Sequence, residues 1–185
     1  MTNVSKVKVF GVGLSRTGTV SLTAALRRLG YRAKHYPHLL QVIEMAARFD
    51  ALTDIPVIVY MEALDRLYPD ARFVLTVRNE EAWIASLTRH YSEKPISHIA
   101  DWKLWTRWAV YGMNEFEEAH FRQAQMEHRA RVRALFKGRP GKLLILDVCG
   151  GEGYEKLCPF LGVPVASDPF PMKNKSKHLQ SVDDI

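Results

Sequence analysis

A glycine-containing turn between an apolar strand and an amphipathic helix constrains this chain more than any other feature. The stretch from Val7 to Gly30 reads VKVFGVGLSRTGTVSLTAALRRLG, and its first part is apolar and β-branched, as buried parallel strands are. Its last part carries leucine and alanine on one helical face and closes at a glycine. The turn from Gly13 to Thr19 therefore places backbone N–H groups at the start of a helix. This arrangement predicts an anion site, most often one for phosphate.

The residues of this turn separate it from two common nucleotide-binding loops. Gly13 and Gly18 have the spacing of a Walker A loop, but Thr19 and Val20 follow, without the lysine that reaches the outer phosphates of a triphosphate. The cation of the loop is Arg16 instead. The spacing GxGxxxxG is also longer than the dinucleotide fingerprint. We expect an anionic ligand without Mg²⁺-triphosphate chemistry, the alternative being a structural turn that needs glycine for its geometry alone.

Length, charge and cysteine content narrow the class of protein. With 185 residues and 47% apolar content, residues 1–185 are interpreted as one domain with a core of its own. The opening MTNVSKVKVF is no apolar signal segment, and no stretch has the length of a membrane span. Cys149 and Cys158 are typical of reduced thiols, so we expect a cytoplasmic location, and no metal-ligand spacing occurs. The net charge of +6 suits a small polyanion; dispersed basic residues and the lack of a binding motif argue against nucleic acid.

Strands and helices alternate along most of the chain. The predicted strands are 7–12, 31–36, 51–54, 71–77 and 143–147. The predicted helices after the one that closes at Gly30 are 38–49, 60–68, 80–90, 114–136 and 152–161, and the region 96–136 is helical throughout in its pattern. The alternation predicts an α/β domain of three layers with a parallel sheet of about five strands. A phosphate loop on the first strand indicates the nucleotide-kinase-like strand order 2-3-1-4-5.

Three predicted strand ends bring polar residues to one edge of the sheet. These are the loop around Arg16, the pair Thr53-Asp54 and Arg78. Ser86 follows on the next helix, where its hydroxyl and the guanidinium fork of Arg78 could close on one phosphate. The alternatives are a surface salt bridge of Arg78 to the glutamates that follow it, and an ordinary helical serine.

Taken together, these residues resemble the sulfotransferase superfamily, which uses 3′-phosphoadenosine 5′-phosphosulfate (PAPS), and within it a group of short P-loop sulfotransferase-like proteins. The family's 5′-phosphosulfate loop, [K/R]-[S/T]-G-T-x-x-L, is matched by residues 16–22. Its 3′-phosphate motif, a strand followed by R-N-x(6)-S, is matched by Arg78-Asn79 and Ser86. The segment 53–56, TDIP, is similar to the T-H-L-P of the cytosolic enzymes, with Asp54 where their catalytic histidine stands. The family's terminal helix and the loop after it are matched by residues 151–154, 157–162 and 169–171.

The resemblance implies an enzyme that moves a sulfuryl group in line from PAPS to a hydroxyl or amine of a small-molecule acceptor, without a metal. It implies that Arg16 stabilises the charge on the departing oxygen. It implies a helical insertion on the acceptor side, near residues 96–136. The residues it assigns to PAPS are Ser15, Arg16, Thr17, Gly18, Thr19, Val20, Ser21, Arg78, Ser86, Lys173 and Lys175.

Two departures from the family pattern concern PAPS itself. The loop R-K-G-x-x-G-x-W, which covers the 3′-phosphate in the family, is absent. Lys173, Asn174 and Lys175 either supply positive cover in its place or form a solvated tail. The aromatic residue that often stacks on adenine is replaced by Ser21, so the stacking partner must come from elsewhere.

The acceptor proton requires a base, and three residues are candidates. Asp54 is the first choice by position, the alternative being that it caps the following helix. His35, at the end of the second strand, and His38 are the other candidates, each with a packing role as its alternative.

An aromatic stripe suggests what the acceptor looks like. Trp102, Trp105, Trp108 and Tyr111 recur at every third position. We expect them to pack against the sheet, and their number favours an apolar or aromatic acceptor.

Two other functions remain open at this point. A P-loop kinase or NTPase would need the lysine that the loop lacks. A non-catalytic module of sulfotransferase fold would bind a nucleotide or a protein without turnover. The oligomeric state does not follow from the sequence.

Overall fold

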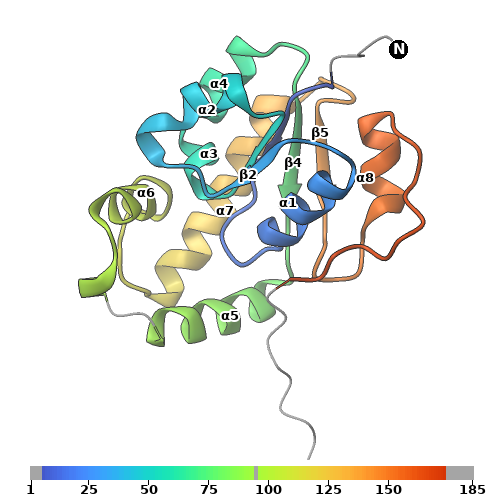
Figure 1. Ribbon diagram of the computed structural model, residues 1–185. Coiled ribbons are helices and arrows are strands. Elements are labelled where there is room, and N and C mark those ends of the chain that lie inside the picture. The colour runs from blue at the N-terminus through green and yellow to red at the C-terminus, as the bar shows by residue number, and fades with distance from the viewer. Residues whose placement is uncertain (1–5, 94–95, 174–185) are drawn as a thin grey trace, which may run out of the picture.

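A parallel five-stranded sheet forms the centre of the protein, in a computed structural model that describes residues 6–93 and 96–173 (Figure 1). The strand order is β2-β3-β1-β4-β5, which confirms the predicted three-layer α/β fold and its strand order. All four strand pairings are parallel. The strands are β1 (Val9–Gly11), β2 (Ala33–His35), β3 (Ala51–Thr53), β4 (Arg72–Thr76) and β5 (Leu143–Leu146).

The central strand β1 is buried on both sides, as its uniformly apolar sequence predicts. Val9 faces one hydrophobic core and Phe10 the other, because successive strand residues point to opposite faces. Both side chains are fully buried. The sheet therefore needs a helical layer on each face.

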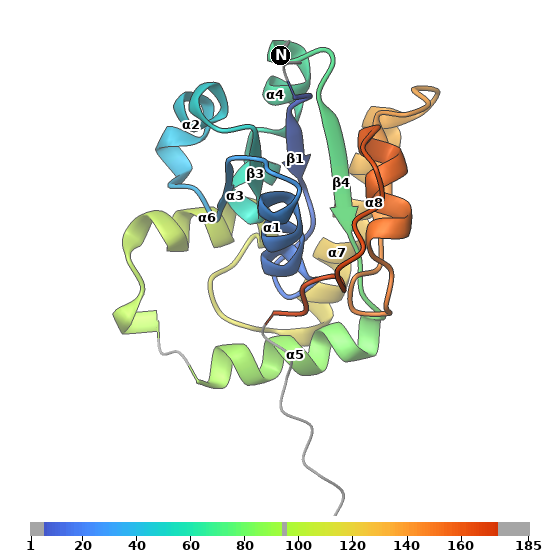
Figure 2. The same ribbon diagram turned by 45° about the vertical axis from the view of Figure 1, so that its right-hand side comes forward.

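The first layer consists of α1 (Thr19–Arg28) and α8 (Tyr154–Leu161), which lie together on one side of the sheet (Figures 1 and 2). Leu22 and Leu26 of α1 and Leu157 of α8 pack into one cluster with Val9 and Val74 of the sheet. This packing fixes α1 on the sheet, so the start of α1 lies at the carboxyl ends of the strands.

The second layer is larger and covers the opposite face around Phe10, Leu52 and Phe73. Its elements, in chain order, are the 3₁₀ turn Leu39–Gln41, α2 (Val42–Arg48), α3 (Ile55–Val59), α4 (Met61–Leu67), α5 (Glu80–Ser92), the 3₁₀ turn Ile96–His98, α6 (Asp101–Tyr111) and α7 (Glu118–Phe136). In Figure 1 the arrowhead of β4 points to the lower edge of the sheet, where α5 lies. In the described ranges, 6–93 and 96–173, no helix is long and apolar enough to cross a membrane.

The predicted aromatic stripe does not pack against the sheet as a whole. Tyr111 is buried in the core with Phe10 and Phe73, but Trp105 and Trp108 are 55% and 65% exposed, so the expectation is wrong for these two residues. The orientation of α6 is set by Tyr111, which stacks on Phe121 of α7 with ring centroids 4.6 Å apart. The helix then ends at Gly112, whose φ of 74° is a conformation that glycine adopts without strain.

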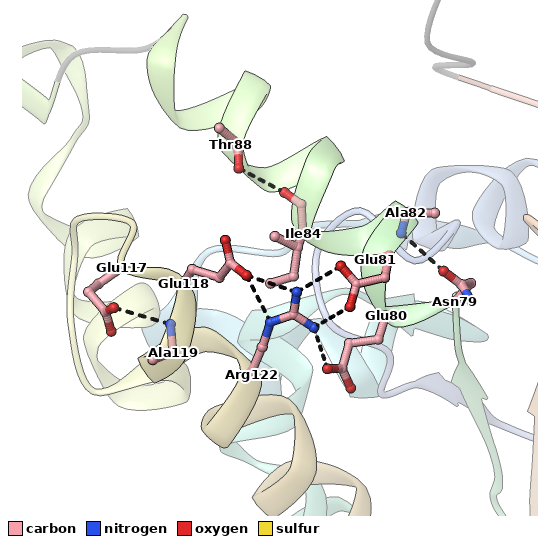
Figure 3. A network of polar contacts seen from close by, with 10 residues as sticks. All are labelled: Asn79, Glu80, Glu81, Ala82, Ile84, Thr88, Glu117, Glu118, Ala119 and Arg122. Carbon is pink, nitrogen blue, oxygen red and sulfur yellow. Dashed lines mark hydrogen bonds and ion pairs between the residues drawn. The ribbon is translucent and has the colours of Figure 1, made fainter.

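A cluster of charges joins α5 to α7 (Figure 3). The guanidinium of Arg122 on α7 donates to the carboxylates of Glu80 and Glu81 at the start of α5, and to Glu118 one turn earlier on its own helix. The three acids lie in the first turns of their helices, where the helix dipole also favours negative charge. These contacts orient the helix that carries Ser86.

Candidate functional site

A pocket of about 930 Å³ opens at the carboxyl ends of the strands, between the loop that follows β1 and the inner face of α6. Ligands of open α/β sheets bind at this edge. Its walls carry many cationic and imidazole groups, among them Arg16, Arg78 and Arg107. Among the described residues that line it, Asp54 is the only acid. A pocket of this charge favours an anionic ligand.

The loop after β1 is fixed from three sides through Ser15. Its N–H donates to the hydroxyl of Tyr111 on α6 at 3.2 Å, and its carbonyl accepts from the indole N–H of Trp83 on α5 at 2.9 Å. Its hydroxyl donates to Asp54 Oδ1 at 3.0 Å. The loop is therefore held in one shape before any ligand arrives.

Glycine is required at two points of this loop. A Cβ at Gly13 would lie 1.9 Å from the Thr76 hydroxyl, and one at Gly18 would lie 2.9 Å from Cβ of Val148. Gly18 also has a φ of 101°. Because no side chain intrudes, the N–H groups of the first turn of α1, which have no carbonyl partner within the helix, remain accessible from the pocket.

Only some of the loop residues assigned to PAPS line the pocket. Gly18, Thr19, Val20 and Ser21 line the pocket together with Ser15 and Arg16. Thr17 does not: its hydroxyl donates to the Leu14 carbonyl at 2.6 Å and bonds the Thr76 hydroxyl at 2.7 Å. The Ser21 hydroxyl accepts from the N–H of Lys173 at 2.9 Å, which holds the C-terminal segment against α1.

Arg16 and Arg78 line the pocket, and the buried Ser86 lies behind Arg16 without lining the pocket itself. Arg16 Nε donates to the Ser86 hydroxyl at 3.0 Å, and Arg78 Nη1 donates to the Arg16 carbonyl at 3.2 Å. Burial lowers the pKa of Arg16, and the neighbouring charges of Arg78 and Arg89 add to this effect. Arg78 Nε is buried without a hydrogen-bond partner in the described chain. Neither guanidinium forms an ion pair with a carboxylate of residues 6–93 or 96–173, so a bound anion would stabilise both.

The alternative reading of Arg78, a salt bridge to the glutamates after it, is not what the structure shows. Glu80 and Glu81 both pair with Arg122 instead (Figure 3). Arg78 makes no ion pair within residues 6–93 and 96–173, so its guanidinium remains free for a ligand.

His35 and Asp54 form a pair at the centre of the site. His35 Nε2 lies 2.7 Å from Asp54 Oδ2, which also accepts from the Thr19 hydroxyl at 2.7 Å. Asp54 Oδ1 accepts from the N–H of Ile55 at 2.7 Å, so Asp54 does cap α3. Burial, the largest influence, would raise the pKa of Asp54, but His35, the Thr19 hydroxyl and the Ile55 N–H together hold that pKa below its ordinary value.

Residues with a strained backbone conformation also line this pocket. In the part of the chain that the structure describes, the non-glycine residues with positive φ are Arg16 at 71°, Tyr36 at 47° and Asp54 at 86°. All three line the pocket. Each such conformation costs roughly 1–3 kcal/mol, and such strain concentrates where function requires it.

The remaining candidates divide between the pocket and its surroundings. Lys173 lines the pocket, whereas Asn174 and Lys175 lie outside the described residues. His38 packs its ring against Trp102 with centroids 4.4 Å apart and does not line the pocket. No group of three His, Cys, Asp or Glu side chains in the described ranges could hold a metal ion.

Sequence reasoning missed three residues that line the pocket, namely Tyr36, Tyr91 and Arg107. Trp102 and Tyr111, which belong to the predicted aromatic stripe, line it as well. Nothing in the sequence distinguishes Arg107 from the other arginines of the helical region. The signal for Tyr36 was its place directly after His35, at a strand end.

Comparisons with known proteins agree with this geometry. A family model described as a sulfotransferase domain matches residues 8–46 and 38–179. The Ava biosynthesis cluster protein M of Aspergillus versicolor is 24% identical over 216 residues, spanning 89% of this chain and 80% of that protein.

Two solved structures are similar in shape. A sulfotransferase from Alicyclobacillus acidocaldarius superposes with a TM-score of 0.59 at 16% identity, over 90% of this chain and 85% of the other. The mouse sulfotransferase SULT7A1, complexed with PAP, gives a TM-score of 0.49 at 15% identity, over 86% of this chain and 60% of the other. The first of these supports a shared fold.

Proposed function

The chain belongs to the sulfotransferase domain family, and we propose that it moves a sulfuryl group from PAPS to a hydroxyl or amine of a small-molecule acceptor. The observation that carries this proposal is that three features line one pocket: the start of α1, the arginines Arg16 and Arg78, which form no ion pair among the described residues, and the His35–Asp54 pair. A site that only binds phosphate would not need the His35–Asp54 pair.

The residues present fit a nucleotide that carries phosphate groups on both the 3′ and the 5′ oxygen of its ribose. The N–H groups of Thr19, Val20 and Ser21 at the start of α1 suit the 5′-phosphosulfate. Arg78, with an unpartnered buried Nε, suits the 3′-phosphate. Ser86 already accepts from Arg16, so we assign it the positioning of that arginine, in addition to any contact with phosphate.

PAPS supplies a sulfuryl group activated by its phosphate leaving group. The acceptor oxygen forms the new S–O bond with its lone pair, while the electrons of the broken S–O bond pass to the phosphate oxygen and yield 3′-phosphoadenosine 5′-phosphate (PAP). Arg16, within the loop, stabilises the charge that develops on that oxygen.

We propose His35 as the base that receives the acceptor proton. Its Nε2 donates to Asp54, so in the neutral ring the lone pair lies on Nδ1. The His35 side chain is 29% exposed, whereas that of Asp54 is 5% exposed. Both Asp54 oxygens already accept hydrogen bonds, so this carboxylate orients His35 and stabilises its protonated form.

The test is a transfer assay with ³⁵S-labelled PAPS and a panel of phenols, alcohols and amines. Labelled product that depends on both acceptor and enzyme supports the proposal. Tight PAP binding without transfer to any acceptor would instead support a non-catalytic module of this fold. Stronger binding of ATP–Mg²⁺ than of PAP would favour a kinase or NTPase.

A cytoplasmic location is part of the same proposal. It rests on the two cysteines, which are both free thiols in the structure, one exposed and one buried.

A further inference from the structure

A second buried cation stands on the α6 side of the pocket. Arg107 is only 8% exposed, although it lines the pocket. No carboxylate pairs with it within the described residues, and its Nη1 is buried without a hydrogen-bond partner there. A buried charge in this state is costly unless an opposite charge arrives.

Aromatic rings surround this guanidinium. It lies over the ring of Tyr91, 4.6 Å from the centroid. Tyr36 lines the same pocket as Arg107. The Tyr36 ring in turn packs against Trp102, with centroids 5.7 Å apart. Arg107 therefore stands in an aromatic wall and not in a polar one.

This cation is separate from the pair that faces the nucleotide. Arg16 and Arg78 are joined by the hydrogen bond from Arg78 Nη1 to the Arg16 carbonyl at 3.2 Å, whereas the guanidinium of Arg107 lies over the ring of Tyr91. The His35–Asp54 pair lines the same pocket as both groups, and the ring of His35 lies 6.1 Å from that of Tyr36.

We propose that Arg107 binds an anionic group of the acceptor, and that the acceptor is a hydroxylated aromatic acid. Its carboxylate pairs with Arg107, its ring packs against Tyr36 and Trp102, and its hydroxyl faces His35. The inference rests on the proposed sulfotransferase function and specifies the acceptor of that same site. Arginine suits this task, since its planar fork matches a carboxylate and also stacks on aromatic rings.

The test compares acids with their own amides on the wild-type protein. The probes are 4-hydroxybenzoate, 4-hydroxyphenylacetate and 3-(4-hydroxyphenyl)propionate, each beside the corresponding amide, with PAP-loaded protein for binding and PAPS for transfer. A charge-assisted hydrogen bond predicts that at least one acid binds about tenfold or more tighter than its amide. If every amide binds as tightly as its acid, or if none of the acids binds, the inference is overturned.

Variants assign the preference to Arg107. Arg107→Gln should raise KM for the preferred acid about tenfold or more while leaving KM for the amide and the thermal shift by PAP unchanged. Arg107→Lys should restore part of the preference. Arg133→Gln, an exposed arginine on α7, removes the same charge far from the pocket and should leave the preference intact.

The outcomes separate the two proposals. If PAP does not bind, the proposed function fails and the inference fails with it. If PAP binds and amides are sulfated as well as acids, the function stands and the inference fails. Should Arg107→Gln not fold, the comparison of acid and amide on the wild-type protein still decides.

Discussion

His35 Nε2 and Asp54 Oδ2 lie 2.7 Å apart, although the two residues come from different strand ends. The family pattern that resembles residues 53–56 has its histidine where Asp54 stands. Here the imidazole comes from the end of β2, and the carboxylate at the end of β3 holds it. The pair thus combines the two candidates for the base, and the third, His38, is packed elsewhere.

Asp54→Asn separates binding from transfer. The amide has nearly the same size and shape as the carboxylate, keeps an oxygen that can cap α3, and meets the same backbone strain at this position. It cannot stabilise a protonated His35, so we expect transfer to fall about 100-fold or more while the thermal shift by PAP persists. Steady-state kinetics and thermal denaturation measure the two effects. The double variant with His35→Ala should lose little more than either single variant, because the residues act as one unit; fully additive losses would speak against the pair.

Arg78→Ala should remove most of the stabilisation by PAP. A saturating ligand at about 100 times its Kd stabilises a protein by about 2.7 kcal/mol, and loss of one charge-assisted contact removes about 1.5–3 kcal/mol of binding. The free variant should melt close to the wild type, because Arg78 makes no ion pair among the described residues. Arg133→Ala is the control, because it removes one positive charge at a position that does not line the pocket. An undiminished PAP shift in Arg78→Ala would show that the 3′-phosphate lies elsewhere.

Arg16→Gly tests whether strain is stored for function. The φ of 71° at Arg16 is unfavourable for arginine and natural for glycine, and the charge of Arg16 is repelled by Arg78. We therefore expect the variant to melt at or above the wild-type temperature although it loses a hydrogen bond to Ser86. Transfer should fall sharply. A variant that melts several degrees lower would mean that the loop conformation depends on the arginine.

His128 predicts how stability changes with pH. It is buried under the sheet, where Nε2 donates to the Val12 carbonyl at 2.7 Å, and burial lowers its pKa to about 4. The unfolded chain binds the proton near pH 6.5, so this contribution to stability is complete above that pH and is lost as the pH falls toward 4. Between pH 7.5 and 5 the loss amounts to about 2 kcal/mol.

Urea denaturation of the wild type and of His128→Gln at the two pH values measures this loss. The variant should be less stable at pH 7.5 but should lose about 2 kcal/mol less on going to pH 5. If the free energy of unfolding falls by the same amount in both proteins between pH 7.5 and pH 5, His128 is not the group that titrates.

The sheet order and the loop could be predicted because their signals are local. The strand from Val9, the glycines at 13 and 18, and the alternation of strands with helices each constrain the topology without knowledge of distant contacts. The helix expected after the strand 51–54 is 60–68, so α3 was not predicted, although the cap considered for Asp54 is the one that the structure shows.

Which side chains of α6 are buried could not be predicted, since tertiary partners select which face of a helix is buried. The stacking of Tyr111 on Phe121 and of Arg107 on Tyr91 turns Trp105 and Trp108 outward, against the expectation from their spacing. The contact between Ser86 and Arg16 could not be predicted either, because the two residues lie 70 positions apart in sequence.

Isothermal titration calorimetry of the wild-type protein with PAP, beside ATP–Mg²⁺ and NAD, tests the central claim most directly. If the loop at the start of α1 and Arg78 together hold a bisphosphorylated adenosine, PAP gives a saturable heat with one site per chain, and the other two nucleotides bind much more weakly. The absence of heat with PAP, or equal binding of ATP–Mg²⁺, would contradict the account.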